Sequence, residues 1–227
     1  MRFNHLATAI FTAVLLASAA HATVVSSTAV ADDWFANNDA TYTSFSVSGD
    51  PTDSLLRTFG ADGTATRSAL EFSLVGIAAG STIHSAVFSV QSRQGSSVAG
   101  GIFSFWGYTG DGAISAADAV ENINLLSTAP TQDIDALYSV DVTALIQSLV
   151  DASRQYAGIL ITVSPQGSFF GSDFVSSEGV AAGFAPSDRP DLTVDFSAAQ
   201  TVPEPGGLVL FGVALAGLVA SYRRRSA

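Results

Sequence analysis

Histidine is the side chain best suited to proton transfer near neutral pH, and this sequence has few. The chain contains three histidines, and two of them, His5 and His21, lie in an apolar N-terminal segment. The third, His84, has the same parity as Ala86 and Phe88 in an alternating stretch, where a histidine is usually a core or rim residue with a hydrogen-bond partner. A Ser-His-Asp triad would depend on His84 alone, so the sequence does not support one.

Paired carboxylates are a second route to catalysis, as in glycoside hydrolysis, where two acids flank the bond. Glu71 falls on the polar face of a predicted strand, Glu121 follows Asp118 in a loop, and Glu178 lies at a strand end. Nothing in the sequence brings two of them together, and solvated surface acids explain them equally well. We therefore assign no catalytic residue and expect a protein that is not an enzyme.

The segment 111–118 resembles the second half of an EF-hand calcium loop, with Asp-Gly followed by a hydrophobic residue and a final acid. The first two ligand positions would be Gly107 and Thr109, which carry no carboxylate. The segment is better interpreted as a turn around Gly-Asp-Gly, with a short helix start at Ser115.

Flat aromatic side chains could serve a sugar-binding surface, because they stack on pyranose rings. Trp34, Trp106 and Tyr108 are the candidates. Alternation in the segment 103–108 places Trp106 and Tyr108 opposite Phe103 and Phe105, so one of the two sets can face solvent. Both tryptophans suit a core equally well.

Charge and cysteine content restrict the class of protein. Between residues 23 and 201, five arginines and no lysine face 19 acidic residues, a formal charge of −14. Such an acidic body repels phosphate backbones, so we expect no nucleic-acid partner. The chain has no cysteine, so stability has to come from a packed core.

Alternation of apolar and polar residues dominates residues 23–201 and predicts strands. In the clearest case, Leu70 and Phe72 share one face and Glu71 lies on the other. One helix is predicted after Asp141, a good N-cap, and is expected to cover an open end or edge of the strands. The predicted strands cover residues 41–47, 53–59, 67–74, 82–91, 102–108, 157–163, 169–176 and 192–196. We expect one all-β sandwich domain with a short helix over residues 23–201.

Both ends of the chain read as targeting segments. Residues 1–22 have a positive start, an apolar stretch and the small-x-small pattern Ala20-His21-Ala22, typical of a secretory signal peptide cut after Ala22. At the other end, residues 206–222 carry no charge and precede three arginines, which predicts a single transmembrane helix with its C-terminal side in the cytoplasm.

Pro203, Glu204 and Pro205 stand directly before this span, where prolines keep the chain extended. Residues 202–227 thus resemble the PEP-CTERM sorting signal of Gram-negative bacteria. The resemblance implies export through the Sec pathway, an intermediate anchored in the inner membrane, and processing by an exosortase. The protein would then reach the cell surface or the extracellular matrix. A plain C-terminal anchor with incidental prolines is the alternative.

A second resemblance is carried by Arg67-Ser-Ala-Leu-Glu-Phe-Ser-Leu and by the turn and strand of residues 77–88. Together with segments 138–145, 156–161 and 188–194, these resemble the DNRLRE family, with Ala78 where that family usually has proline. The resemblance implies a jelly-roll sandwich of the carbohydrate-binding-module kind, usually non-catalytic. Jelly rolls often hold a structural calcium, for which four acids near the first and last strands are weak candidates: Asp32, Asp33, Asp191 and Asp195. No other cofactor is expected.

Three functions remain open. The first is a non-catalytic extracellular protein whose sandwich binds exopolysaccharide or a biofilm matrix. The second is a purely structural matrix protein without a ligand. The third is a polysaccharide-active enzyme with an unrecognised carboxylate pair, which would need two carboxyl groups roughly 5–10 Å apart in a cleft.

Overall fold

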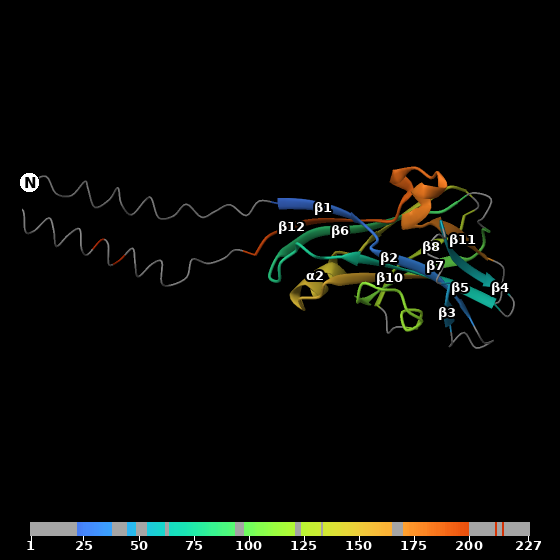
Figure 1. Ribbon diagram of the computed structural model, residues 1–227, viewed down its shortest axis with the longest axis horizontal. Coiled ribbons are helices and arrows are strands. Elements are labelled where there is room, and N and C mark those ends of the chain that lie inside the picture. Colours follow the sequence, from blue (N-terminus) through green and yellow to red (C-terminus); the bar gives the residue numbers. More distant parts are fainter. Residues whose placement is uncertain are drawn as a thin grey trace, which may run out of the picture.

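Two β-sheets packed face to face form the body of the protein (Figure 1). The computed structural model describes residues 22–37, 45–48, 54–61, 64–93, 98–120, 124–132, 134–164 and 170–199, together with residues 212 and 215. Within these ranges the expectation of an all-β sandwich with one short α-helix is confirmed. The predicted signal peptide, the Pro-Glu-Pro motif and almost all of the predicted membrane span lie outside them, as does Glu121.

The first sheet contains four strands in the order β1-β12-β6-β9. These are β1 (Ala22–Thr28), β12 (Asp191–Ser197), β6 (Thr82–Gln91) and β9 (Leu137–Asp141). Every neighbouring pair in this sheet is antiparallel.

The second sheet is larger and has the order β11-β4-β5-β10-β7-β8, with β2 paired to β5 and β3 paired to β2. Its strands are β11 (Phe170–Val175), β4 (Leu55–Ala61), β5 (Thr64–Ser73), β10 (Tyr156–Ser164), β7 (Ile102–Gly110), β8 (Asn124–Pro130), β2 (Ala31–Asn37) and β3 (Phe45–Val47). Two 3-10 helices, η2 (Ser177–Ala182) and η3 (Pro186–Asp188), connect β11 to β12.

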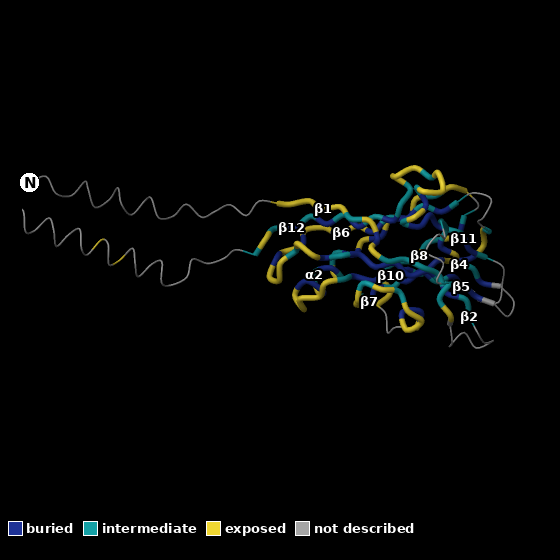
Figure 2. The backbone as a smooth tube through the Cα atoms, in the orientation of Figure 1, coloured by how far each residue is buried: buried dark blue, intermediate teal, exposed yellow. Residues whose placement is uncertain are grey.

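Side chains that alternate along the strands fill the space between the sheets, as the period of two requires. Leu70 and Phe72 of β5 and Phe88 of β6 are buried there, and the rings of Phe72 and Phe88 meet edge to face at 5.7 Å. Phe103 and Phe105 of β7 belong to the same core. Figure 2 shows this buried layer running along the sandwich between its more exposed outer surfaces.

His84 departs from the expected parity. The ladder between β6 and β12 has a register shift, with Asp195 opposite Ser85 and Phe196 opposite Ile83. This bulge turns Ile83 into the core and leaves His84 exposed, where its Nε2 lies 2.7 Å from Ser197 Oγ. The predicted hydrogen-bond partner is present, but the position on the apolar face was wrong, because a bulge changes the side chains' alternation.

The helix α2 (Thr143–Asp151) links β9 of the first sheet to β10 of the second. It buries Ile146, Leu149 and Val150 in the core, which fits the expectation that it covers the sandwich. The N-cap residue is Val142, without a side-chain cap, so the prediction of Asp141 at that position was wrong by one residue. Asp141 Oδ1 nevertheless accepts a hydrogen bond from the Thr143 N–H at 2.9 Å, in the first turn of the helix. Hydrogen bonds from the side chain and then the N–H of Thr143 lower the pKa of Asp141.

The two ends of the described domain lie side by side. Ala22, the first residue of β1, pairs with Ser197, the last residue of β12. Consequently β1 begins and β12 ends at the same end of the sandwich (Figure 1). Among the described residues, no helix is both long enough and apolar enough to cross a membrane.

Candidate functional site

The outward-facing side of β8, β7 and β10 carries Trp106 in its centre. Ser104, Trp106 and Tyr108 alternate with the core residues Phe103 and Phe105, so they point away from the core. The predicted division of the segment 103–108 into two faces is therefore confirmed. Trp106 is half-buried, and its indole N–H donates to Thr162 Oγ1 at 2.9 Å. This hydrogen bond fixes the orientation of the ring on the sheet.

The strand ladders surround Trp106 with hydroxyl and apolar side chains. Ser104 pairs with Thr128 on one side and with Thr162 on the other. Leu125 pairs with Trp106 and is 53% exposed. Ile102 is 50% exposed and pairs with Pro130 and Ser164. We call these eight residues the Trp106 face: Ile102, Ser104, Trp106, Leu125, Thr128, Pro130, Thr162 and Ser164.

None of the eight residues of the Trp106 face is charged. A partly exposed aromatic ring beside a row of hydroxyl groups can stack on an apolar sugar face and exchange hydrogen bonds with its hydroxyls. Next to this face, Leu125 also borders a groove of about 630 Å³ between β8, Ile83 and the first half of α2.

Tyr108 does not belong to the exposed part of this side. It is only 3% exposed, so its ring is not accessible for stacking, contrary to the expectation for a sugar-binding residue. The ring lies across Gly158, where a Cβ atom would come within 2.4 Å of ring atoms. Gly158 pairs with Tyr108 of β7 and with Glu71 of β5, so only glycine lets the ring reach across β10.

Glu71 is fully buried, which corrects the expectation of a solvated carboxylate. The loop that follows β7 covers it, and Glu71 Oε2 accepts hydrogen bonds from the N–H groups of Asp111, at 3.0 Å, and Gly112. Burial is the main cause that raises the pKa of Glu71, and the nearby charges of Asp118 and Asp111 add to it. Burial and then the charge of Glu71 raise the pKa of Tyr108.

The loop over Glu71 is a turn, as predicted for the Gly-Asp-Gly segment. Asp118 Oδ2 accepts from the Ser115 N–H at 2.6 Å and lies 3.0 Å from Ser115 Oγ. Ser115 therefore donates to Asp118 inside a turn and does not begin a helix. Arg67 donates to the carbonyl of Ala119, and the loop closes a second apolar cluster outside the sheet: Phe35, Ala69, Tyr108, Ala119 and Leu160.

Trp34, the other predicted stacking residue, lies on β2 and is half-buried. The Arg57 guanidinium lies over its ring, 5.5 Å from the centroid, a cation–π contact. Arg57 also faces Asp173 across the β4–β11 ladder, with Nε and Oδ1 4.0 Å apart. Arg57 therefore occupies one face of this ring.

Three of the four acids considered for a structural calcium have separate hydrogen-bond partners, whereas Asp195 Oδ1 is buried without one among the described residues. Asp191 accepts from Ser26 and Thr193, and Asp33 accepts from the N–H of Trp34. Asp32 accepts from both the N–H and the hydroxyl of Ser177. In the described part of the chain, no three acidic or histidine side chains are grouped so that they could hold a metal ion.

Besides Glu71 and its neighbours Asp111 and Asp118, the fold also brings together the carboxyl groups of Asp32 and Glu178. Burial raises the pKa of Asp32 to about 7, against hydrogen bonds from Ser177 that lower it, and Glu178 raises it further. No local pattern in the sequence points to this pair, because Asp32 lies on β2 and Glu178 lies on η2, far along the chain. A carboxyl group with such a pKa can act as a general acid or base near neutral pH.

The raised pKa of Asp32 predicts a loss of stability as the pH rises. Because the folded state holds this proton more tightly than the unfolded chain, the ionised carboxylate costs free energy from about pH 4 upward, and the cost levels off above about pH 7. Asp32 is partly exposed, so we expect an effect on the order of 2 kcal/mol. Urea unfolding from pH 4 to 8 should show this decline in the wild type and a smaller one in Asp32→Asn. Identical pH profiles of stability for the wild type and Asp32→Asn would contradict a raised pKa of Asp32.

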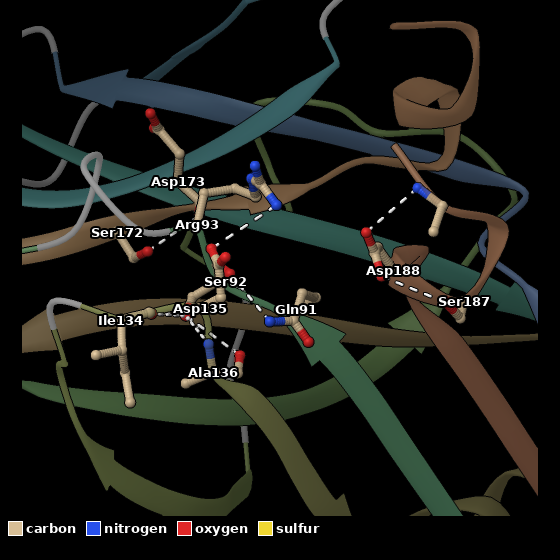
Figure 3. Close-up of polar contacts among 11 residues, drawn as sticks. Gln91, Ser92, Arg93, Ile134, Asp135, Ala136, Ser172, Asp173, Ser187 and Asp188 are labelled. Carbon is tan, nitrogen blue, oxygen red and sulfur yellow. Dashed lines mark hydrogen bonds and ion pairs between the residues drawn. The ribbon is translucent and has the colours of Figure 1, made fainter. Parts of the chain in front are cut away.

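At the end of the sandwich opposite Ala22 and Ser197, a polar cluster joins the sheets (Figure 3). Buried Ser92 follows β6 and bridges to Phe174 of β11. Its Oγ lies 3.2 Å from the carbonyl oxygens of Ile134 and Ala136. Arg93 lies 3.7 Å from Asp135 and over the ring of Phe184. These contacts are directed at the protein's own chain, so we interpret the cluster as a closure of the sandwich.

The comparisons with known proteins identify the tail. Residues 201–225 match the family model of the PEP-CTERM protein-sorting motif. This match implies exosortase-dependent sorting of a secreted protein that is anchored through its C-terminus and processed at the cell surface. The search of curated proteins found no match for this chain.

Proposed function

We propose that the sandwich is a non-catalytic module that binds a neutral polysaccharide on the Trp106 face, and that the sorting tail delivers it to an extracellular matrix. One observation supports this proposal most strongly. The Trp106 face is uncharged and combines one tryptophan, one exposed leucine and a row of hydroxyl groups, although the domain has a formal charge of −14. An acidic body repels anionic polymers, so an uncharged face favours a neutral glycan. The resemblance to the DNRLRE family supports the same function.

The proposal places the protein outside a Gram-negative cell, after Sec export and an intermediate anchored in the inner membrane. The partners are then the exosortase during processing and exopolysaccharide afterwards. β1 begins and β12 ends at the same end of the sandwich, which supports attachment through the C-terminal tail. A domain attached at that end presents its long faces away from the attachment point.

Affinity electrophoresis tests the glycan-binding part. In gels that contain the neutral exopolysaccharide of the producing cell, we expect the wild-type protein to be retarded and Trp106→Ala to migrate as in a gel without glycan. Loss of the stacking ring should weaken binding by about 1–3 kcal/mol, by analogy with the stacking of bases on aromatic rings.

Trp34→Ala is the matched control, because Arg57 already covers a face of that ring. It should keep the retardation of the wild type. Unchanged mobility of the wild type in every gel would favour the purely structural alternative. Equal loss of retardation in Trp106→Ala and Trp34→Ala would contradict the assignment of glycan binding to the Trp106 face.

A second candidate, a polysaccharide-active enzyme, is favoured by one observation, the juxtaposition of Asp32 and Glu178. If these carboxyl groups perform hydrolysis, incubation with the polysaccharide should release reducing ends, and Asp32→Asn or Glu178→Gln should each stop the release. Binding without release of reducing ends in the wild type would support the non-catalytic proposal.

A further inference from the structure

The outer edge of β1 is free of any partner strand in the described part of the chain. β1 pairs with β12 along its other edge, over all seven residues from Ala22 to Thr28. A free strand edge exposes a row of unpaired N–H and C=O groups, which another strand can bind.

Unlike the other strands at sheet edges, β1 has none of the usual features that protect an edge. It contains no charged residue, no proline and no glycine, and almost all of its side chains are exposed (Figure 2). By contrast, β8 ends in Pro130, β9 ends in Asp141, and β3 has only three residues. Proline, charge and short length are devices that prevent edge pairing in other proteins.

The side chains of β1 are apolar and β-branched, which favours pairing. Val24 is 66% exposed and Val25 is 41% exposed. Val25 lies on the core side of β1, because it pairs with Val194 of β12, which is buried in the core. Since Val25 is itself exposed, the core remains accessible to solvent along β1. An additional strand on this edge would cover Val25.

We propose that this edge binds the β1 strand of a second copy of the chain, antiparallel and centred on Val25. Identical strands fit one another in this register, because Val25 meets Val25, Val24 meets Ser26, and Thr23 meets Ser27, with no charged side chain in the ladder. Elsewhere the formal charge of −14 repels a second copy, so this uncharged edge is where two copies can approach. The pairing joins two four-stranded sheets into one of eight strands. It does not depend on glycan binding.

The absence of cysteine from the chain allows a direct test, because a single introduced cysteine has no native competitor. Residues opposite one another in antiparallel strands have Cα atoms about 4.5–5.5 Å apart, within the range that a disulfide spans. Val25→Cys in the full chain, exported by its own cell, should therefore give a disulfide-linked dimer on a non-reducing gel.

Val75→Cys is the matched control, because Val75 is more exposed than Val25 but lies in a turn away from the edge. We expect at least about tenfold more dimer from Val25→Cys, since pairing raises the effective concentration of the two thiols. Adding Val24→Lys to Val25→Cys should abolish the excess. Equal amounts of dimer from Val25→Cys and Val75→Cys would overturn the proposal.

The direction of pairing is tested with Thr23→Cys and Ser27→Cys. In the antiparallel register each of these alone places its two thiols about 13 Å apart along the strands, whereas a mixture of the two variants brings unlike thiols together. Formation of the disulfide-linked dimer only when the two variants are mixed supports the proposed pairing. Dimer from each variant alone would show a parallel pair and would overturn the antiparallel arrangement.

Discussion

Replacing Pro203, Glu204 and Pro205 together by alanine is expected to leave the chain uncut and held in the membrane. The motif match covers these three residues, and sorting by this route depends on an exosortase. Alanine is the strongest helix former, so the variant removes the extended prolines before the apolar residues 206–222 and lets a helix continue through the processing site.

The measurement is an immunoblot of membrane, surface and medium fractions, read for the size of the protein and its location. The wild type should appear in a shortened form outside the membrane fraction, and the triple variant should appear only at the longer size in the membrane. Gln200→Ala, just outside the matched residues, is the control and should be processed as the wild type. Normal processing of the triple variant would remove the sorting interpretation of these three residues.

Glu71 is expected to be the most sensitive polar residue of the folded domain. Glu71→Ala leaves the N–H groups of Asp111 and Gly112 without their acceptor and opens a space beside Tyr108. Loss of two buried hydrogen bonds predicts a decrease of about 2–4 kcal/mol in the free energy of unfolding. The loop that closes the outer apolar cluster should also become susceptible to proteolysis.

Glu71→Gln is the matched control, because glutamine keeps a carbonyl acceptor for the loop and has no charge. It should stay within about 1 kcal/mol of the wild type at pH 5. Because the pKa of Glu71 is raised, the ionised wild-type carboxylate costs more as the pH rises, so the glutamine variant should gain stability relative to the wild type toward pH 8. Chemical unfolding at both pH values measures these differences. Equal stability of the alanine and glutamine variants would contradict this role.

Alternation predicted much of the sandwich, since β6 begins and ends at the expected residues and Phe103 and Phe105 lie on the face opposite Trp106, as expected. This worked because a strand with one buried face repeats every two residues. The prediction failed at His84, where a bulge shifts the parity, and at β1, whose nearly all-exposed side chains show no alternating burial. β2 and β8 were also missed, because their sequences mix polar and apolar residues without a clear period.

The sites were less predictable than the strands, because they depend on residues distant in the chain. Glu71 has the polar parity of a solvated residue, and only the loop 40 residues later buries it. Asp32 meets Ser177 across 145 residues, which no local pattern can reveal. By contrast, parity within β7 correctly placed Trp106 and Tyr108 on the face opposite Phe103 and Phe105, although it did not show which face points outward.

The proposal that a glycan lies on the Trp106 face can be tested with the two tryptophans of the chain as separate reporters. Trp34→Phe leaves Trp106 as the only indole, and Trp106→Phe leaves only Trp34. The fluorescence of each variant is titrated with the neutral exopolysaccharide of the producing cell, in the presence of a soluble quencher. The glycan should protect Trp106 from quenching in Trp34→Phe and have no effect on Trp106→Phe. Protection of Trp34 alone, or of neither residue, would contradict it.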